Sequence, residues 1–204
     1  MKKINLSHFE PHSRANGPGV RAVIWVQGCS IGCKDCINQH TWPHKPKELV
    51  TVDELFNRVM GVADLIEGVT FSGGEPFQQA GPLAKLTNRL SQAGLSIVCF
   101  TGFTLEFLKS QKAPTGSELF LQQIDLLIDG PYIEAKKTNS LPLRGSANQR
   151  LCFLTNQYSI VDVNCPRVEF HISQGQITST GFMGKEAETA LFATMGVKLE
   201  SECV

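Results

Sequence analysis

The sequence lacks several features that mark membrane proteins and nucleic-acid-binding proteins. No apolar run in its 204 residues comes near the roughly 20 residues that a helix needs to span a bilayer. Neither sign of charge is in excess, because 19 basic residues balance 19 acidic ones, and this excludes a broad electrostatic footprint for nucleic acid or anionic lipid. The first residues lack the long apolar stretch of a secretory signal. We therefore expect a cytoplasmic protein, and the length predicts one domain, or one domain with an appendage, around a real core.

A disulfide framework is not expected either. The chain has seven cysteines, an odd number for a protein of a reducing compartment. Cys99 and Cys152 lie within apolar runs and are expected in the core, whereas Cys165 and Cys203 belong to no motif. The other three form a C-x3-C-x2-C pattern, which brings three thiolates around one centre, as metal and iron–sulfur sites require. These three are Cys29, Cys33 and Cys36.

Strands alternate with helices along most of the chain. The sequence predicts strands at residues 20–26, 68–71, 95–101, 124–128 and 151–154. It predicts helices at 52–67 and 79–93 and a broken helical stretch at 104–122. This alternation is typical of parallel βαβ units, whose functional residues gather at the carboxyl ends of the strands. Since a closed eight-fold barrel usually takes about 250 residues, the predicted fold class is α/β, with a partial, open β/α barrel.

The C-terminal part of the chain differs in character from the rest. Residues 168–173 and 176–180 are typical of a β-hairpin, and residues 184–194 of a short helix. We therefore divide the chain into a core at 1–155 and a C-terminal extension at 156–204. The extension could cover a sheet edge, dock a partner or shape a pocket for a small substrate.

The three crowded cysteines allow two kinds of site. A zinc site would need a fourth ligand, and His40 or His44 follows the cysteines closely enough to supply it. A 4Fe-4S cubane on three cysteines would instead leave one iron without a protein ligand, free to bind a small molecule. A second motif, Ser72-Gly-Gly-Glu-Pro76, stands at the end of the next predicted strand.

Three cysteines at the end of one strand and a Gly-Gly-Glu-Pro segment at the end of the next resemble the radical S-adenosylmethionine superfamily. The resemblance implies a 4Fe-4S cluster on the cysteines, and S-adenosylmethionine with its methionine part held by Gly73, Gly74 and Glu75. It also implies reductive cleavage of this cofactor to a 5′-deoxyadenosyl radical. Asp35 stands where the superfamily often has an aromatic residue near the adenine, so adenine contacts are expected from the backbone or from Ile37.

Further motifs narrow the resemblance to the glycyl-radical-enzyme activases, and within them to the branch that acts on anaerobic ribonucleotide reductase. These motifs lie at residues 16–21, 27–29, 37–42, 101–104, 129–132 and 143–150. The first usually begins with aspartate, where this chain has Asn16. The resemblance covers roughly residues 8–154. It implies hydrogen abstraction from a glycine of anaerobic ribonucleoside-triphosphate reductase or another glycyl-radical enzyme, with flavodoxin or ferredoxin as the electron donor.

The same resemblance suggests further site residues. Asn38 and Arg21 are candidates for orienting groups near the cluster, although Arg21 could equally be a surface charge at the start of a strand. Asp129 is a candidate for contacts with the ribose or the amine of S-adenosylmethionine. Arg144 and Arg150 either position the partner's glycine loop or are solvated charges.

Two alternatives to an activase are compatible with the sequence. A stand-alone radical enzyme could modify a metabolite or a peptide with the same core. A non-enzymatic iron–sulfur or zinc module is disfavoured, because such a module does not need a Gly-Gly-Glu-Pro segment at the second strand.

Overall fold

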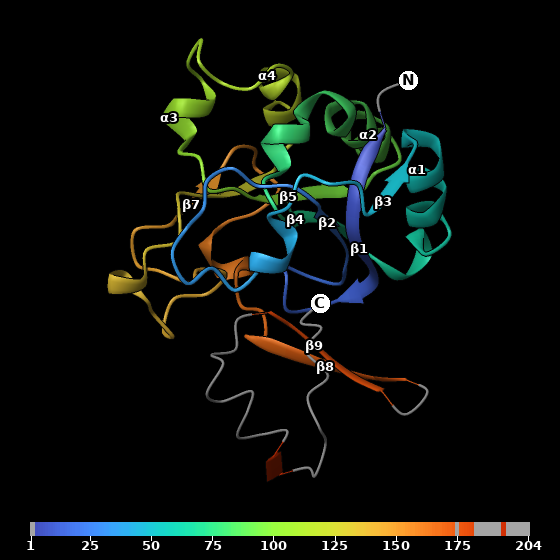
Figure 1. The fold of residues 1–204 in the computed structure, drawn as a ribbon. Coiled ribbons are helices and arrows are strands. Elements are labelled where there is room, and N and C mark those ends of the chain that lie inside the picture. The colour runs from blue at the N-terminus through green and yellow to red at the C-terminus, as the bar shows by residue number, and fades with distance from the viewer. Residues whose placement is uncertain (1–2, 174–175, 182–192, 195–204) are drawn as a thin grey trace.

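A seven-stranded sheet forms the centre of the molecule (Figure 1). The computed structural model describes residues 3–173, 176–181 and 193–194. The strands lie side by side in the order β3-β1-β2-β4-β5-β6-β7. Their bounds are β1 Ile4–Ser13, β2 Arg21–Val26, β3 Glu48–Val50, β4 Gly68–Gly73, β5 Ser96–Phe100, β6 Leu126–Asp129 and β7 Arg150–Phe153. Strands β2, β4, β5 and β6 run parallel to their neighbours among these four.

The expected parallel arrangement is confirmed for these four central strands, but it is wrong for the edges of the sheet. Strand β7 is antiparallel to β6, because only the short 3-10 helix η4 (Glu134–Lys136) and loops connect the two, with no crossover helix. Strands β1 and β3 were not expected, and β1 pairs antiparallel with both β2 and β3. Much of β1 is only half-buried and it contains Pro11, so its sequence lacks the apolar run that marks a buried strand.

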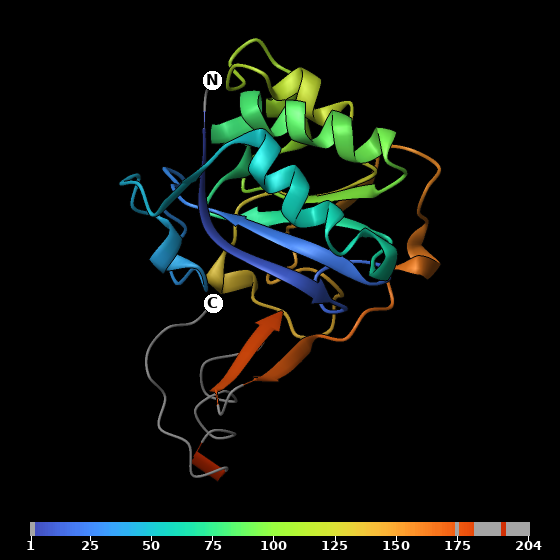
Figure 2. The same ribbon diagram turned by 90° about the vertical axis from the view of Figure 1, so that its right-hand side faces the viewer.

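Helices cover one face of the sheet (Figure 2). They are α1 Val52–Met60, α2 Ala80–Gln92, α3 Leu105–Leu108 and α4 Ser117–Leu121. The predicted capping box of α1 is confirmed, since the hydroxyl of Thr51 accepts the N–H of Glu54 while the Glu54 carboxylate accepts the N–H of Thr51. This helix ends earlier than expected, and a 3-10 turn follows it. Gly94 ends α2 as expected, with a left-handed φ of 84°.

Short 3-10 helices connect the longer elements. They are η1 Gln39–Thr41, η2 Ala63–Leu65, η3 Pro76–Gln79, η4 Glu134–Lys136 and η5 Ile160–Asp162. Among the described residues, no helix has both the length and the apolar character that crossing a membrane requires.

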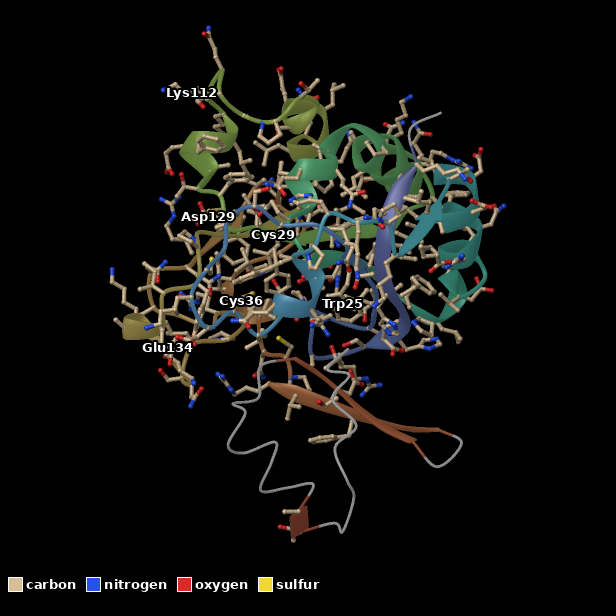
Figure 3. All side chains as sticks on the ribbon, viewed as in Figure 1. Trp25, Cys29, Cys36, Lys112, Asp129 and Glu134 are labelled. Atoms are coloured by element: carbon tan, nitrogen blue, oxygen red, sulfur yellow. The ribbon has the colours of Figure 1, made fainter. Side chains whose placement is uncertain are left out.

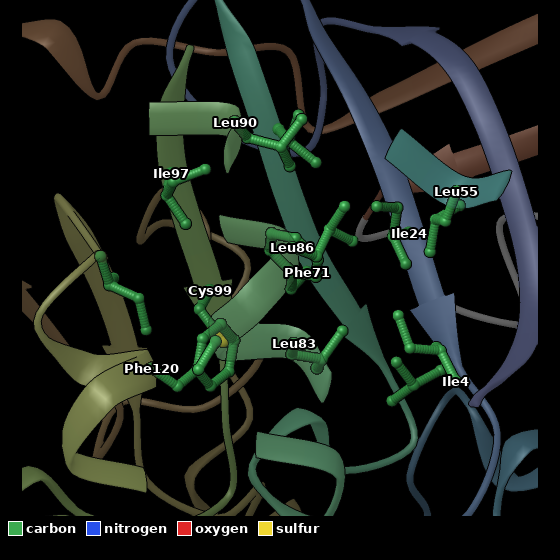
Figure 4. Packing of buried hydrophobic residues seen from close by; sticks show 14 of the residues in the cluster. Ile4, Ile24, Leu55, Phe71, Leu83, Leu86, Leu90, Ile97, Cys99 and Phe120 are labelled. Carbon is green, nitrogen blue, oxygen red and sulfur yellow. The ribbon is translucent and has the colours of Figure 1, made fainter. Parts of the chain in front are cut away.

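The main core lies between the helices and the sheet (Figure 4). Phe71 of β4 and Phe120 of α4 are fully buried, and their rings meet edge to face with centroids 5.8 Å apart. Leu83 of α2 and Cys99 of β5 belong to the same cluster, so the expectation that Cys99 is a core residue is confirmed. Burying an aliphatic or aromatic side chain of this size contributes about 1.5–3 kcal/mol. This packing holds the carboxyl ends of the parallel strands next to one another.

A two-stranded sheet from the C-terminal extension lies across the main sheet from the helices (Figures 1 and 2). Strands β8 Val168–Ser173 and β9 Gln176–Gly181 are antiparallel, which confirms the predicted hairpin. Before the hairpin, Val163 is buried in a second cluster with Val98 of β5, so the extension is anchored on the core. The short helix expected at 184–194 falls almost entirely outside the described residues.

Candidate functional site

A cavity lies at the carboxyl ends of the parallel strands β2, β4 and β5, where Cys29 and Cys36 are marked in Figure 3. Most of the predicted site residues line it, namely Cys29, Cys33, Cys36, Ile37, Asn38, Gly73, Gly74 and Glu75. The cysteine loop follows β2 and the Gly-Gly-Glu segment ends β4, and these two strands are hydrogen-bonded neighbours. Parallel pairing therefore brings together two motifs that lie far apart in the sequence.

The cysteine loop is held by backbone hydrogen bonds to the segment around η1. The N–H of Gly28 donates to the carbonyl of Thr41 at 2.7 Å, and the N–H of Cys29 donates to that of Trp42 at 3.0 Å. Within the loop, the N–H of Cys36 donates to the carbonyl of Cys33 at 3.2 Å. The Thr-Trp pair that the resemblance singled out thus supports the backbone of the cysteine loop, and Trp42 also lines the cavity.

The three thiols form a donor set that fits a 4Fe-4S cluster, because they line one cavity. Each is half-buried and free. Among the described residues, no three His, Cys, Asp or Glu side chains are placed to hold one ion together. A cubane takes each cysteine on a different iron, so it requires a shared cavity rather than sulfurs that converge on one point. Neither His40 nor His44 lines the cavity, and Nε2 of His44 is hydrogen-bonded to the Ser30 hydroxyl at 2.9 Å.

Burial also affects the protonation of the thiols. It raises the pKa of Cys29 and of Cys33, so both are protonated at neutral pH when no metal is bound. Iron binds the thiolate, and loading the cluster must therefore release protons from these residues.

Two glycines allow the Gly-Gly-Glu segment to press against the cysteine loop. A Cβ on Gly74 would lie 2.3 Å from the carbonyl oxygen of Gly28, and one on Gly73 would lie 2.6 Å from the backbone nitrogen of Val26. Gly73 also has a φ of 97°, which side chains rarely adopt. The contact is completed by the N–H of Glu75, which donates to the carbonyl of Gly28 at 2.9 Å. The two motifs therefore form one backbone unit.

Glu75 presents a buried carboxylate to the cavity. It is only 1% exposed, and Oε1 accepts the N–H of Phe77 and the hydroxyl of Thr101, each at 2.9 Å. The other oxygen, Oε2, accepts the N–H of Gly102 at 2.9 Å. Among the described residues no cation forms an ion pair with it. Burial raises the pKa of Glu75 to about 7. An uncompensated buried carboxylate of this kind would be stabilised by a ligand ammonium group.

Two of the predicted site residues are not among the residues that line the cavity. Asp35 is exposed, with a φ of 59°, and the neighbouring Ile37 faces the cavity instead. Asp129 is fully buried, and its Oδ1 accepts Nε of Arg150 at 2.9 Å while Oδ2 accepts the N–H of Leu105 at 2.7 Å. Its carboxylate therefore stabilises the start of α3 and pairs with Arg150, rather than facing a ligand.

None of the three candidate arginines is among the residues that line the cavity. Arg21 is fully buried at the first residue of β2, at the opposite end of this strand from the cysteines. Both expectations for it, an orienting group near the cluster and a surface charge, are therefore wrong. Its guanidinium donates to the Tyr158 hydroxyl at 2.8 Å and to the Ser96 carbonyl at 2.9 Å. Arg150 connects Asp129 with Glu106. Nε of Arg144 donates to the nearby carbonyl of Pro142 at 3.4 Å.

The cavity wall also contains residues to which sequence reasoning assigned no role. Asn16, Thr101 and Tyr132 occur within motifs that carried the resemblance, and this was the signal that could have identified them. Thr180 and Gly181 of β9 line the cavity as well, and no motif marks them.

Comparisons with known proteins identify the family of the chain. The family described as a 4Fe-4S single cluster domain matches residues 15–152. An anaerobic ribonucleoside-triphosphate reductase-activating protein of Vibrio cholerae is 34% identical over 157 residues, which cover 72% of this chain and 96% of the relative. A protein with the same description from Enterobacteria phage T4 is 30% identical over 153 residues, which cover 72% of this chain and 93% of the relative.

Two further proteins match smaller parts of the chain. A pyruvate formate-lyase-activating enzyme of Staphylococcus epidermidis is 37% identical over 100 residues, which cover 47% of this chain and 40% of the enzyme. Among solved structures, QueE from Escherichia coli matches 50% of this chain and 53% of its own, with a TM-score of 0.38 and 24% identity.

Proposed function

We propose a function from the premise that the chain belongs to the 4Fe-4S single cluster domain family and to the anaerobic ribonucleoside-triphosphate reductase-activating proteins within it. The activity is the reductive cleavage of S-adenosylmethionine, used to install a glycyl radical on an anaerobic ribonucleotide reductase. When bound, the cluster and S-adenosylmethionine supply the electron and the radical chemistry. The resemblance that the motifs indicated is confirmed at the level of the family.

One observation carries the proposal. Three half-buried thiols and a buried carboxylate without a counter-ion face the same cavity, and backbone hydrogen bonds join the segments that hold them. A site for iron needs the thiols, and a site for an amino acid moiety needs an anion for its ammonium group. A zinc module needs only the first of these features.

The residues of the chain then take the following roles. Cys29, Cys33 and Cys36 hold the cluster. Glu75 binds the methionine ammonium group in this proposal, and the close approach of Gly74 to the cysteine loop supports this role. Further contacts with the cofactor come from Gly73, Ile37 and Asn38, which line the cavity. Asp35 and Asp129 are not among the lining residues and receive no cofactor contact in this proposal.

The partners and the compartment follow from the same proposal. The relatives named above are described as activators of anaerobic ribonucleoside-triphosphate reductase, so this reductase, or another glycyl-radical enzyme, is the proposed partner. Flavodoxin or ferredoxin is the proposed electron donor. The described cysteines are all free, which supports a reducing, cytoplasmic location. We also propose that the four parallel strands and their neighbours form a partial, open β/α barrel around the cavity.

The experiment that tests this function uses the full chain, reconstituted anaerobically with iron and sulfide and supplied with dithionite. Chromatography should detect 5′-deoxyadenosine from S-adenosylmethionine, and electron paramagnetic resonance should detect a glycyl doublet when the reductase from the same organism is added. The control is the triple variant Cys29→Ala, Cys33→Ala, Cys36→Ala. Equal 5′-deoxyadenosine from the control and the wild type would remove both radical-enzyme hypotheses.

A stand-alone radical enzyme with a small substrate is the second candidate. The observation that favours it is that the C-terminal extension contributes Thr180 and Gly181 to the cavity wall. In the same assay this candidate predicts 5′-deoxyadenosine without a glycyl doublet on any reductase of the source organism.

A further inference from the structure

The C-terminal extension reaches the candidate active site from outside the region that defines the family. The family match ends at residue 152, and β9 begins at Gln176. Thr180, near the end of β9, is only 8% exposed and lines the same cavity as the three cysteines. The hairpin is therefore a part of the cavity wall that the matched region of the family does not contain.

The hairpin is attached to the segment between β1 and β2. Nδ2 of Asn16 donates to Oγ1 of Thr180 at 2.8 Å, and the N–H of Arg14 donates to Oε2 of Glu169 in β8 at 2.8 Å. Gly181 packs against the same segment, because a Cβ there would lie 3.1 Å from the Cβ of Ala15, and its φ is 108°. These contacts fix the end of β9 beside Asn16.

The hydrogen bonds of Asn16 determine what it can offer to a ligand. Its Nδ2 has two protons, and it donates to Oγ of Ser13 at 2.9 Å and to Oγ1 of Thr180 at 2.8 Å. In the part of the chain that the structure describes, no donor is bonded to Oδ1 of Asn16, and Asn16 lines the cavity. The amide is thus oriented by Thr180, and its oxygen is the atom left to accept a hydrogen bond.

Thr180 supplies a hydrogen-bond donor next to the Oδ1 acceptor of Asn16. Its Oγ1 accepts from Asn16, so its own proton is available to donate. No described group accepts that proton. One acceptor and one donor, held next to each other in a wall, match the N–H and the C=O of a peptide backbone.

We propose that Asn16 and Thr180 form a peptide-binding wall of the cavity, in which Thr180 contributes to binding the backbone around the reacting residue of a polypeptide substrate. This inference rests on the proposed function and deepens it, since it assigns the recognition of the partner's main chain to two side chains, one of them in the extension.

The test compares Thr180→Val, which removes both hydrogen bonds at similar volume, with Thr180→Ser, which keeps the hydroxyl. Thr115→Val, in the exposed loop before α4, is the matched control. With the intact reductase as substrate, Thr180→Val should raise KM about tenfold with a much smaller change in kcat, and Thr180→Ser should restore KM to within about threefold of the wild type. A KM for Thr180→Val that equals the KM of the Thr115→Val control would overturn the proposal.

A second measurement does not depend on activity. Hydrogen exchange of the chain without cluster, followed by mass spectrometry, should show faster exchange at residues 13–17 in Thr180→Val and unchanged exchange in Thr180→Ser. Equal exchange in all three proteins would overturn the placement of Asn16 by Thr180. A wild type that puts no glycyl doublet on the reductase is a failure of the proposed function, and the exchange result then decides separately whether Thr180 orients Asn16.

Discussion

The hydroxyl of Thr101 donates a 2.9 Å hydrogen bond to Oε1 of Glu75. Thr101 is the residue after β5, and Glu75 lies two residues beyond Gly73, the last residue of β4; both side chains are buried. Glu75 is thus held by the neighbouring parallel strand, and its affinity for a proton depends on that strand as well as on burial.

Removing this bond should weaken the binding of S-adenosylmethionine. Thr101→Val takes away a donor that favours the ionised carboxylate, so the pKa of Glu75 rises above about 7 and less of the ionised form is present at pH 7. We expect the Kd for S-adenosylmethionine at pH 7 to rise several-fold, up to about tenfold for a shift of one pKa unit, when measured by calorimetry on the reconstituted protein. Thr101→Ser keeps the donor and should bind as the wild type does. If both variants bind equally well, Thr101 does not act through Glu75.

The buried carboxyl group also predicts how stability depends on pH. The pKa of Glu75 is raised from 4.5 to about 7, so between these values the unfolded chain has lost the proton and the folded chain still holds it. The contribution of Glu75 therefore lowers the free energy of unfolding as the pH rises from 4.5 to about 7, and it is constant above that range. At about 1.4 kcal/mol per pKa unit, the change is on the order of 3 kcal/mol.

Urea unfolding of the wild type and of Glu75→Gln, both without cluster, measures this contribution. Glu75→Gln has no carboxyl group at residue 75 to ionise. Its free energy of unfolding, relative to that of the wild type, should therefore increase between pH 4.5 and pH 7. A difference between the two proteins that is the same at pH 4.5 and at pH 8 would contradict the assignment.

The contact between the two motifs requires glycine at residue 74. Gly74→Ala would place a Cβ 2.3 Å from the carbonyl oxygen of Gly28, so the Gly-Gly-Glu segment must move away from the cysteine loop. We expect the reconstituted variant to bind S-adenosylmethionine at least tenfold more weakly. Gly81→Ala is the matched control, because a Cβ at this position of α2 meets nothing within 4 Å. Alanine in a helix is favoured by roughly 1 kcal/mol over glycine, so the control should bind normally and unfold at a slightly higher temperature.

Arg150 should stabilise the fold through Asp129 rather than through Glu106. Asp129 is fully buried, whereas the Glu106 side chain is 69% exposed. Arg150→Met leaves a buried carboxylate without its main charged partner and should lower the free energy of unfolding by about 1–3 kcal/mol at pH 7. Glu106→Gln removes only an exposed partner and should change it by less than about 0.5 kcal/mol. Equal losses in the two variants, measured by urea unfolding, would show that burial of Asp129 does not govern the interaction.

Local sequence patterns predicted the central part of the fold and the core of the site. The strands β2, β4, β5 and β6 are buried and read as apolar runs, and the helices α1 and α2 carry clear end signals at Thr51 and Gly94. The antiparallel edge strand β1 was missed, because a half-buried strand with polar residues has no continuous apolar run. The direction of β7 was wrong, because strand direction depends on the connection and not on the composition of the strand.

The sequence by itself identified the main candidate residues of the cavity wall, since the three cysteines and the Gly-Gly-Glu segment are short motifs whose members are neighbours in the chain. Only the tertiary structure decided that Arg21 is buried away from the cysteines and that Asp129 pairs with Arg150. It also decided that Thr180 meets Asn16 across 164 residues of sequence. Periodicity and spacing report which residues share a helix, a strand or a loop, whereas contacts between distant segments depend on how those elements pack, and no local pattern records that.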